Sequence, residues 1–263
     1  MVNLQGMDTL VSSLFAPPAP RWVSLLEVDP DLGRDLDSAA VAAATRVARA
    51  EVLSLDVGPW SPDLAASGRG VMGALILHGV LCRTVMIGHE GSDELVGPGD
   101  VVYPWARHVD SNVLEAEVSW EVLQPAEVAV LDEAFMRTIA PWPELVAALA
   151  CRYGERSRLQ GALAATAHVK RMDVRLLALL WQLAERFGRV TPDGVIVPVR
   201  LTHARLARLV GGQRPSVTTA LTRMAREGTI KRWADGGFVL APESIATLDR
   251  LAHPGERVAA SAD

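Results

Sequence analysis

The stretch Leu201–Trp233 reads LTHARLARLVGGQRPSVTTALTRMAREGTIKRW, and it is short, regular and basic. The 263-residue chain around it is acidic, with a formal net charge of −5 at pH 7. Between Gly188 and Trp233 there are nine Lys and Arg residues against two acidic ones. A basic module on an acidic body predicts an anionic partner for that module, and double-stranded DNA is the first candidate.

Two short helices joined by a glycine turn are expected within this stretch. Thr202 suits the cap of a first helix that runs to about Val210, and Gly211-Gly212 supplies the tight turn. Pro215 suits the first turn of a second helix, since its missing N–H would have no helical partner there. That helix is expected to end at about Glu227. Its apolar stripe consists of Val217, Ala220, Leu221 and Met224.

The outward face of the second helix is small and basic, as a helix-turn-helix requires of the helix that enters the major groove. The hairpin signal Asp235-Gly236-Gly237 follows, which predicts a winged helix. Arg214 suits bidentate bonds to guanine, and Lys231 and Arg232 suit phosphate contacts. The residues expected to bind DNA are Thr202, His203, Gln213, Arg214, Ser216, Thr218, Thr219, Thr222, Arg223, Arg226 and Lys231.

The region from about Val52 to Leu131 alternates short apolar runs with turn residues such as Gly58-Pro59 and Gly97–Asp100. Many short strands with frequent turns predict an antiparallel barrel or roll. The strands expected are Val52–Val57, Val71–Leu77, Val80–Ile87, Glu94–Val96, Asp100–Tyr103, Val113–Trp120 and Val128–Leu131.

Helices are expected on both sides of the strand-rich region. The Ala-rich stretch Ser38–Glu51 predicts a short helix, and Asp132–Ile139 predicts another. Pro143–Lys170 predicts a helix about 40 Å long, which is longer than one small domain needs. Met172–Phe187 predicts a connecting helix that Gly188 ends.

The stretch LTHARLARLVGGQRPSVTTALTRMAREGTIKR resembles the DNA-binding domain of the cyclic AMP receptor protein family, the Crp/Fnr-type bacterial regulators. The order from about Val52 to Leu240 (roll, long helix, connecting helix, winged helix) is similar to theirs. The resemblance implies a homodimer in which the long helix pairs with its twin. It also implies that the two recognition helices read an inverted repeat, with half-sites about one helical turn apart.

The resemblance places Arg214 on the family's base-reading arginine. Neighbouring contact positions fall on Gln213, Ser216 and Thr219. Many members have Glu directly after that arginine, whereas this chain has Pro215. One acceptor for a cytosine amino group is therefore missing, and the family's best-known operator is not expected.

The roll departs from the members that bind cyclic AMP. Their phosphate cassette has a Gly-Glu pair and then an Arg beside a small residue. The corresponding stretch Gly97–Asn112 reads GPGDVVYPWARHVDSN, where Tyr103-Pro104-Trp105 replaces the Gly-Glu pair. A degenerate cyclic-nucleotide-binding-like domain is expected, with no cofactor and an unidentified effector. The candidate ligand residues are Tyr103, Trp105 and Arg107. Trp60, Tyr103 and Trp105 either line an apolar pocket or pack in the core of the roll.

Other classes of site find little support. The cysteines, Cys82 and Cys151, are too few and too distant for an iron–sulfur cluster, and such sparse usage fits a reducing cytoplasm. The common hydrolase, metalloprotease and nucleotide-binding motifs are missing, so no catalytic activity is expected. The most apolar stretch, Val71–Cys82, is too short to span a bilayer. A haem or metal sensor would need His78, Cys82, His89 or His108, which have no metal-ligand spacing, and no metal is expected.

The expected α+β chain divides into a flexible leader (1–20), a β-roll sensor or scaffold (21–142), a dimerisation helix (143–170), a winged helix-turn-helix (171–250) and a flexible tail (251–263). Its expected partners are double-stranded DNA, a second copy of itself and RNA polymerase, without a membrane.

Two alternatives stay open. A winged helix that binds protein is disfavoured by Arg214, Arg223 and Arg226, because interfaces deplete charge at their core. A ligand-independent architectural role on DNA would show weak sequence preference.

Overall fold

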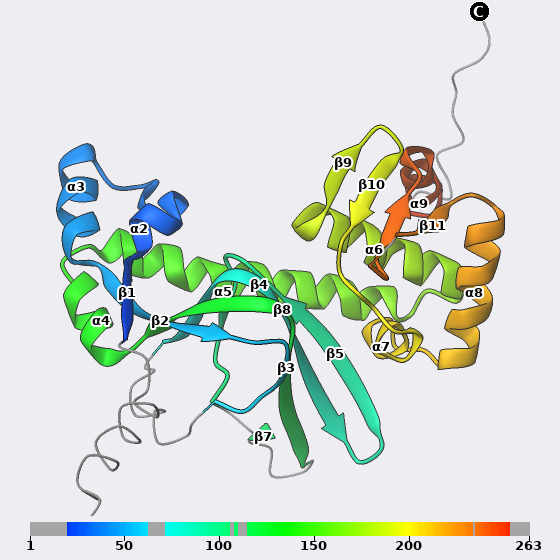
Figure 1. Ribbon diagram of the computed structural model, residues 1–263, viewed down its shortest axis with the longest axis horizontal. Helices are drawn as coiled ribbons and strands as arrows, with labels where there is room; N and C mark the ends of the chain where they lie inside the picture. Colours follow the sequence, from blue (N-terminus) through cyan, green and yellow to red (C-terminus); the bar gives the residue numbers. More distant parts are fainter. Residues whose placement is uncertain (1–19, 63–71, 106–107, 110–114, 234, 253–263) are drawn as a thin grey trace, which may run out of the picture.

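The computed structural model describes residues 20–62, 72–105, 108–109, 115–233 and 235–252 (Figure 1). A large antiparallel sheet with short helices forms one end of the molecule, and helices with a small sheet form the other. The long helix α5 runs along the large sheet toward the second end. This is the expected α+β architecture. Nearly all of the predicted leader (1–20) and tail (251–263) lies outside the described residues.

Two long strands, β4 (Gly73–Ile87) and β8 (Ala116–Leu131), form the centre of the large sheet. The sequence predicted two separate strands in each of these regions. The predicted break in β4 is instead a set of register shifts between Ile76 and Leu81. Gly79 has φ +86° there, and a Cβ on it would lie 2.4 Å from the carbonyl oxygen of Pro125. The glycine therefore bends the strand without ending it.

The described part of this sheet has eight strands in the order β1-β2-β8-β4-β5, with β3 and β7 paired to β8 and β6 paired to β4. Together they form the expected roll. The remaining strands are β1 (Arg21–Ser24), β2 (Arg49–Leu55), β3 (Gly58–Trp60), β5 (Glu90–Val96), β6 (Val101–Val102) and β7 (His108–Val109).

Short helices cover the end of the roll. The predicted helix Ser38–Glu51 is too long, because α3 ends at Val47 and Arg49–Glu51 belongs to β2. Ala50 and Val52 are buried in alternation with more exposed neighbours, which is the period of a strand. Asp132 caps α4 as its position predicts, accepting from the backbone N–H of Phe135. The helices are α2 (Leu25–Val28), η1 (Pro30–Gly33), α3 (Ser38–Val47) and α4 (Glu133–Ile139).

The long helix α5 (Pro143–Thr166) begins at the predicted proline and ends four residues before the predicted Lys170. Its first turns pack Leu145 and Leu149 into the core beneath the N-terminal helices. The connecting helix α6 (Met172–Phe187) has the predicted limits. No helix in the described residues is long and apolar enough to cross a membrane.

The C-terminal end of the molecule has the predicted helices and hairpin, a strand where the apolar run Val195–Val197 predicts one, and three elements that the sequence did not predict, β9, η3 and α9. The small sheet has the order β11-β12-β10-β9. The elements are β9 (Arg189–Thr191), β10 (Gly194–Val197), α7 (His203–Leu209), α8 (Arg214–Arg226), β11 (Ile230–Arg232), β12 (Phe238–Leu240), η3 (Pro242–Ser244) and α9 (Ile245–Ala252).

The apolar core of the C-terminal helices extends into the roll. Val80, Cys82 and Leu95, all on roll strands, belong to the same cluster of buried side chains as the apolar faces of α6, α7 and α8. The winged helix is therefore packed against the roll and is not held by its covalent connection alone. The domain limits 21–142, 143–170 and 171–250 stay predictions.

Candidate nucleic-acid interface

The turn between α7 and α8 is built as the sequence predicts. The hydroxyl of Thr202 accepts a hydrogen bond from the backbone N–H of Arg205, 3.2 Å away, and so caps α7. Gly211 has φ +61°, and the N–H of Gly212 bonds to the carbonyl of Ala207 at 2.8 Å. This left-handed glycine cap turns the chain toward α8. A Cβ on Gly212 would lie 2.4 Å from the Met172 Cε, so the turn packs tightly on α6.

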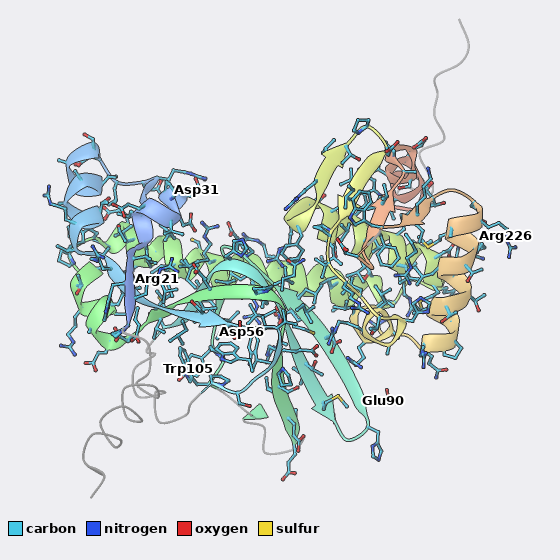
Figure 2. The ribbon with its side chains drawn as sticks, viewed as in Figure 1. Arg21, Asp31, Asp56, Glu90, Trp105 and Arg226 are labelled. Carbon is cyan, nitrogen blue, oxygen red and sulfur yellow. The ribbon has the colours of Figure 1, made fainter. Side chains whose placement is uncertain are left out.

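Helix α8 has one buried and one exposed face. The buried face is the predicted apolar stripe of Val217, Ala220, Leu221 and Met224. Arg226 projects outward from α8, on the side away from the roll (Figure 2). Within the described residues, neither Arg214 nor Arg226 is in an ion pair, which leaves both guanidinium groups available to a ligand. The exposed face consists of Gln213, Arg214, Ser216, Thr218, Thr219, Thr222, Arg223 and Arg226.

The threonines of this face donate their hydroxyl protons within the helix. Thr218, Thr219 and Thr222 each bond to the carbonyl four residues earlier, at 3.0, 3.1 and 2.9 Å. A hydroxyl oxygen keeps acceptor capacity when its proton is engaged. Toward an incoming ligand these side chains therefore offer acceptors and methyl groups in the first instance.

Arg223 is less free than its exposure indicates. Its guanidinium lies 2.8 Å from a carboxylate oxygen of Asp173, at the start of α6, and Arg171 bonds to the same oxygen at 2.6 Å. Burial acts to raise the pKa of Asp173, but the hydrogen bond from Arg171 and the charges of Arg171 and Arg223 hold that pKa below its ordinary value. This predicted DNA-binding residue therefore anchors α8 to α6.

The wing is the hairpin β11–β12, with Ile230 opposite Leu240 and Arg232 opposite Phe238. Lys231 is exposed, as a phosphate contact requires. The Arg232 guanidinium lies over the Phe238 ring, 4.5 Å from its centroid. It also lies 2.8 Å from the Nε2 atom of His203. Arg232 was expected as a phosphate contact, yet it is engaged within the protein.

Two arginines of the basic segment face the roll. Arg208 donates through Nε to Asp93 of β5 at 2.8 Å, and Arg205 donates through Nη2 to Glu121 of β8 at 2.6 Å. The Asp93 side chain is fully buried, and its other oxygen lies 3.5 Å from the Arg205 Nε. The hydroxyl of Thr84 donates to Asp93 as well. Part of the positive charge that predicted an anionic partner is therefore neutralised inside the molecule.

Sequence reasoning did not find this docking cluster, which consists of Thr84, Asp93, Glu121, Arg205 and Arg208. The spacing of Arg205 and Arg208 puts both on one side of α7, so the pattern was available. The acidic partners lie more than 80 residues earlier in the chain, and nothing local pairs them with α7. Cys82 lies beside the cluster, where burial foremost and the charge of Asp93 raise the pKa of its thiol to about 12.

The aromatic residues predicted to bind a ligand have separate positions. Trp105 is 5 % exposed and packs in the core of the roll with Ile76 and Trp120, whereas Tyr103 is 45 % exposed. The rings of Tyr103 and Trp105 meet edge to face, with centroids 5.6 Å apart. Arg107 lies outside the described residues. In the described residues, no three His, Cys, Asp or Glu side chains are placed to hold a metal ion.

Residues 174–246 match the family model for the Crp-like helix-turn-helix domain. The C-terminal part of the chain is a Crp-like helix-turn-helix domain. Over most of its length the chain has the fold of a solved Crp/Fnr-family transcription regulator. No curated protein matches the chain at a significant level.

Solved structures support the fold over most of the chain. A mutant of CooA from Carboxydothermus hydrogenoformans has a TM-score of 0.56 at 14 % identity, covering 76 % of this chain and 87 % of its own. A Crp/Fnr-family transcriptional regulator from Thermus thermophilus has a TM-score of 0.52 at 22 % identity, and the match covers 77 % of this chain and 98 % of that one. FixK2 from Bradyrhizobium japonicum has a TM-score of 0.54 at 13 % identity, and the match covers 80 % of this chain and 99 % of that one.

The docking cluster generates a prediction on stability. Asp93→Asn removes the negative charge that Arg205 and Arg208 share and leaves the side-chain oxygen that Thr84 bonds. The free energy of unfolding should fall by about 3 kcal/mol, the lower end for a broken buried pair, because Arg208 is partly exposed. Urea unfolding followed by tryptophan fluorescence measures it.

The matched control is Asp31→Asn, which breaks the exposed pair with Arg34 and should change the free energy by less than about 0.5 kcal/mol. Equal unfolding midpoints for the two variants would show that the cluster contributes no net stability.

Proposed function

We propose that the protein is a homodimeric transcription regulator that reads an inverted-repeat operator with α8. The observation that carries the proposal is the exposed face of α8, whose Arg214 and Arg226 have no ion-pair partner in the described residues. That face belongs to a Crp-like helix-turn-helix domain. The small, basic surface around the N-terminal end of α8 suits the major groove, because groove-reading helices enter with that end.

The individual contacts that we propose follow from chemistry. Arg214, in the first turn of α8, reads guanine through its two parallel N–H groups. Gln213, Ser216 and Thr219 lie beside it and provide the remaining base contacts. Arg226 and Lys231 bind phosphates, which adds affinity but carries no sequence information. We assign Thr202 and Thr222 to the same backbone contacts.

The dimer that we propose forms through α5. The exposed side of this helix carries five small residues and one arginine at alternating steps of four and three, the spacing of a helix-pairing seam. A Cβ added to Gly154 or to Gly161 would meet no atom within 4 Å, so nothing in the described chain covers them. Small side chains let two helix backbones approach closely. The seam consists of Ala147, Cys151, Gly154, Arg158, Gly161 and Ala165.

The roll, in this proposal, does not bind cyclic AMP in the usual way. Trp105 replaces part of the expected phosphate cassette, and its side chain fills the core of the roll beside Trp120. The pair Tyr103 and Trp105 then acts as packing. The roll serves as a scaffold that holds the winged helix through the docking cluster, or as a sensor for an effector of another class.

Arg214→Ala tests the reading of DNA. Selection of bound duplexes from a random pool, at two salt concentrations, should recover an inverted repeat with the wild-type protein. The variant should bind the selected duplex about 10- to 100-fold more weakly, since one bidentate base contact is worth about 1–3 kcal/mol. Arg46→Ala, an exposed arginine on α3, is the control and should bind like the wild type.

The selection also separates the alternatives. Strongly salt-dependent binding without a recovered motif would indicate phosphate contact alone and an architectural role. No binding to any duplex would favour a protein-binding winged helix. Either result contradicts the proposed operator.

Ala165→Glu tests the dimer. It would place a carboxylate against its twin across the α5 seam, and like charges there should weaken the dimer by at least about tenfold. Sedimentation velocity over a concentration series measures the dimer dissociation constant. Ala42→Glu is the matched control, since it adds the same charge at an exposed alanine of α3. If both variants dimerise equally, the interface lies elsewhere.

A further inference from the structure

A chain of hydrogen bonds joins the wing to the start of α8 through one histidine. The Nη2 of Arg232, on β11, lies 2.8 Å from the Nε2 of His203, the first residue of α7. The Nδ1 of His203 lies 2.9 Å from the Oγ1 of Thr218 on α8. The Thr218 hydroxyl in turn lies 3.0 Å from the carbonyl oxygen of Arg214. Three elements that are separate in sequence therefore meet at His203.

The protons in this chain have one arrangement. Arg232 can only donate, so the Nε2 of His203 accepts, and its Nδ1 carries the proton. The Nδ1–H then donates to Thr218, whose own proton goes to the Arg214 carbonyl. Each donor faces an acceptor only while the imidazole is neutral. A second proton on His203 would set an N–H against the guanidinium of Arg232.

The surroundings of His203 favour the neutral ring. The charged groups that face it are Arg232 on β11 and Arg214 on α8. Burial, followed by the charges of these two arginines, lowers the pKa of His203 from its ordinary value of 6.5. The chain of bonds is thus complete above the lowered pKa, and it is lost as the pH falls through that value.

Arg232 is held from the other side as well. Its guanidinium lies over the Phe238 ring and within 3.4 Å of the carbonyl oxygen of Gly236, at the tip of the wing. The arginine therefore fixes the wing, while His203 and Thr218 fix the backbone that carries Arg214. The spacing between the wing and the base-reading end of α8 depends on these bonds.

We propose that Arg232, His203 and Thr218 are positioning residues that hold the wing in a fixed position relative to the N-terminal end of α8. Protonation of His203 then lowers the preference of the protein for the operator over other DNA. The inference rests on the proposed function. It assigns to His203 and Thr218 a structural coupling in place of the direct DNA contact that the sequence predicted. A phosphate contact by His203 would strengthen both kinds of binding equally on protonation, and would leave their ratio unchanged.

The ratio of affinities for the selected duplex and for a scrambled duplex tests the proposal. In the wild-type protein the ratio should fall about tenfold between pH 7.5 and a pH one unit below the His203 pKa that NMR gives, the effect of losing one charge-assisted hydrogen bond. His203→Gln keeps an acceptor for Arg232 but has no proton to gain. It should retain the high ratio at both pH values.

Three further variants sharpen the test. His203→Leu has no acceptor and should show the low ratio at both pH values. Arg232→Gln should lower the ratio in the same way. Lys231→Gln, at the next position of the wing, is the matched control and should weaken both affinities while leaving their ratio intact. A wild-type ratio that does not change with pH, or equal behaviour of Arg232→Gln and Lys231→Gln, would refute the coupling.

A measurement without DNA separates this proposal from the proposed function. Nitrogen NMR of the free protein should find the His203 ring protonated on Nδ1 at pH 7.5, with a pKa below 6.5. If no duplex is selected but this tautomer is found, the proposed reading of an operator is contradicted, while the hydrogen bonds between Arg232, His203 and Thr218 are supported. A proton on Nε2 would overturn the coupling whatever the DNA experiments give.

Discussion

The carboxylate of Asp93 lies inside the molecule, on a strand of the roll, and the arginines that neutralise it come from α7 of the winged helix. A buried charge is costly unless it is paired. If α7 moved away from the roll, the Asp93 carboxylate would either become exposed to solvent or stay buried without its arginine partners. This constraint fixes which side of α7 faces the roll. Because α7 and α8 are joined by a tight glycine turn, it also fixes the direction of the exposed face of α8.

The charge of the C-terminal segment is divided between two tasks. Arg205 and Arg208 are neutralised by the roll, and Arg223 is paired with Asp173 on α6. Arg214 and Arg226 stay on the surface. The acidic body and the basic module are thus not two independent parts with opposite partners, since the body takes up some of the module's charge. In the proposed function, electrostatic attraction to DNA would then come from fewer residues than the sequence count implies.

The sequence predicted the local structure of the helix-turn-helix well, because its signals are local. Thr202 as a cap, Gly211-Gly212 as a turn and the proline at the start of α8 each act within one or two turns of backbone. The apolar stripe of α8 was correct to the residue for the same reason. The strands of the roll were predicted in pieces, since the bulges around Gly79 look like turns when the pairing strand is unknown.

Contacts between residues that lie far apart in the chain could not be predicted from the sequence. Nothing near Arg208 in sequence signals a buried carboxylate on β5, and nothing near His203 signals Arg232. Helix α3 was predicted too long because alanine favours a helix, whereas pairing of Glu51 and Val52 with β8 decides the outcome. Of the predicted ligand residues, Trp105 turned out to be core, which composition alone cannot distinguish from a pocket wall.

The Asp173 ion pairs have a mechanical consequence. Arg223 ties the C-terminal half of α8 to the start of α6, and Arg175 of α6 donates to the carbonyl of Gly211 just before α8 at 3.1 Å. The two helices therefore form a rigid arm whose pivot is the short connection between α5 and α6. In such an arm, the end of α8 farthest from the pivot moves over a greater distance than the residues close to the pivot. A rotation of a few degrees at residues 167–171 would displace the outer end of α8 with the bonds inside the arm intact, but it would have to break the ion pairs that hold α7 to the roll.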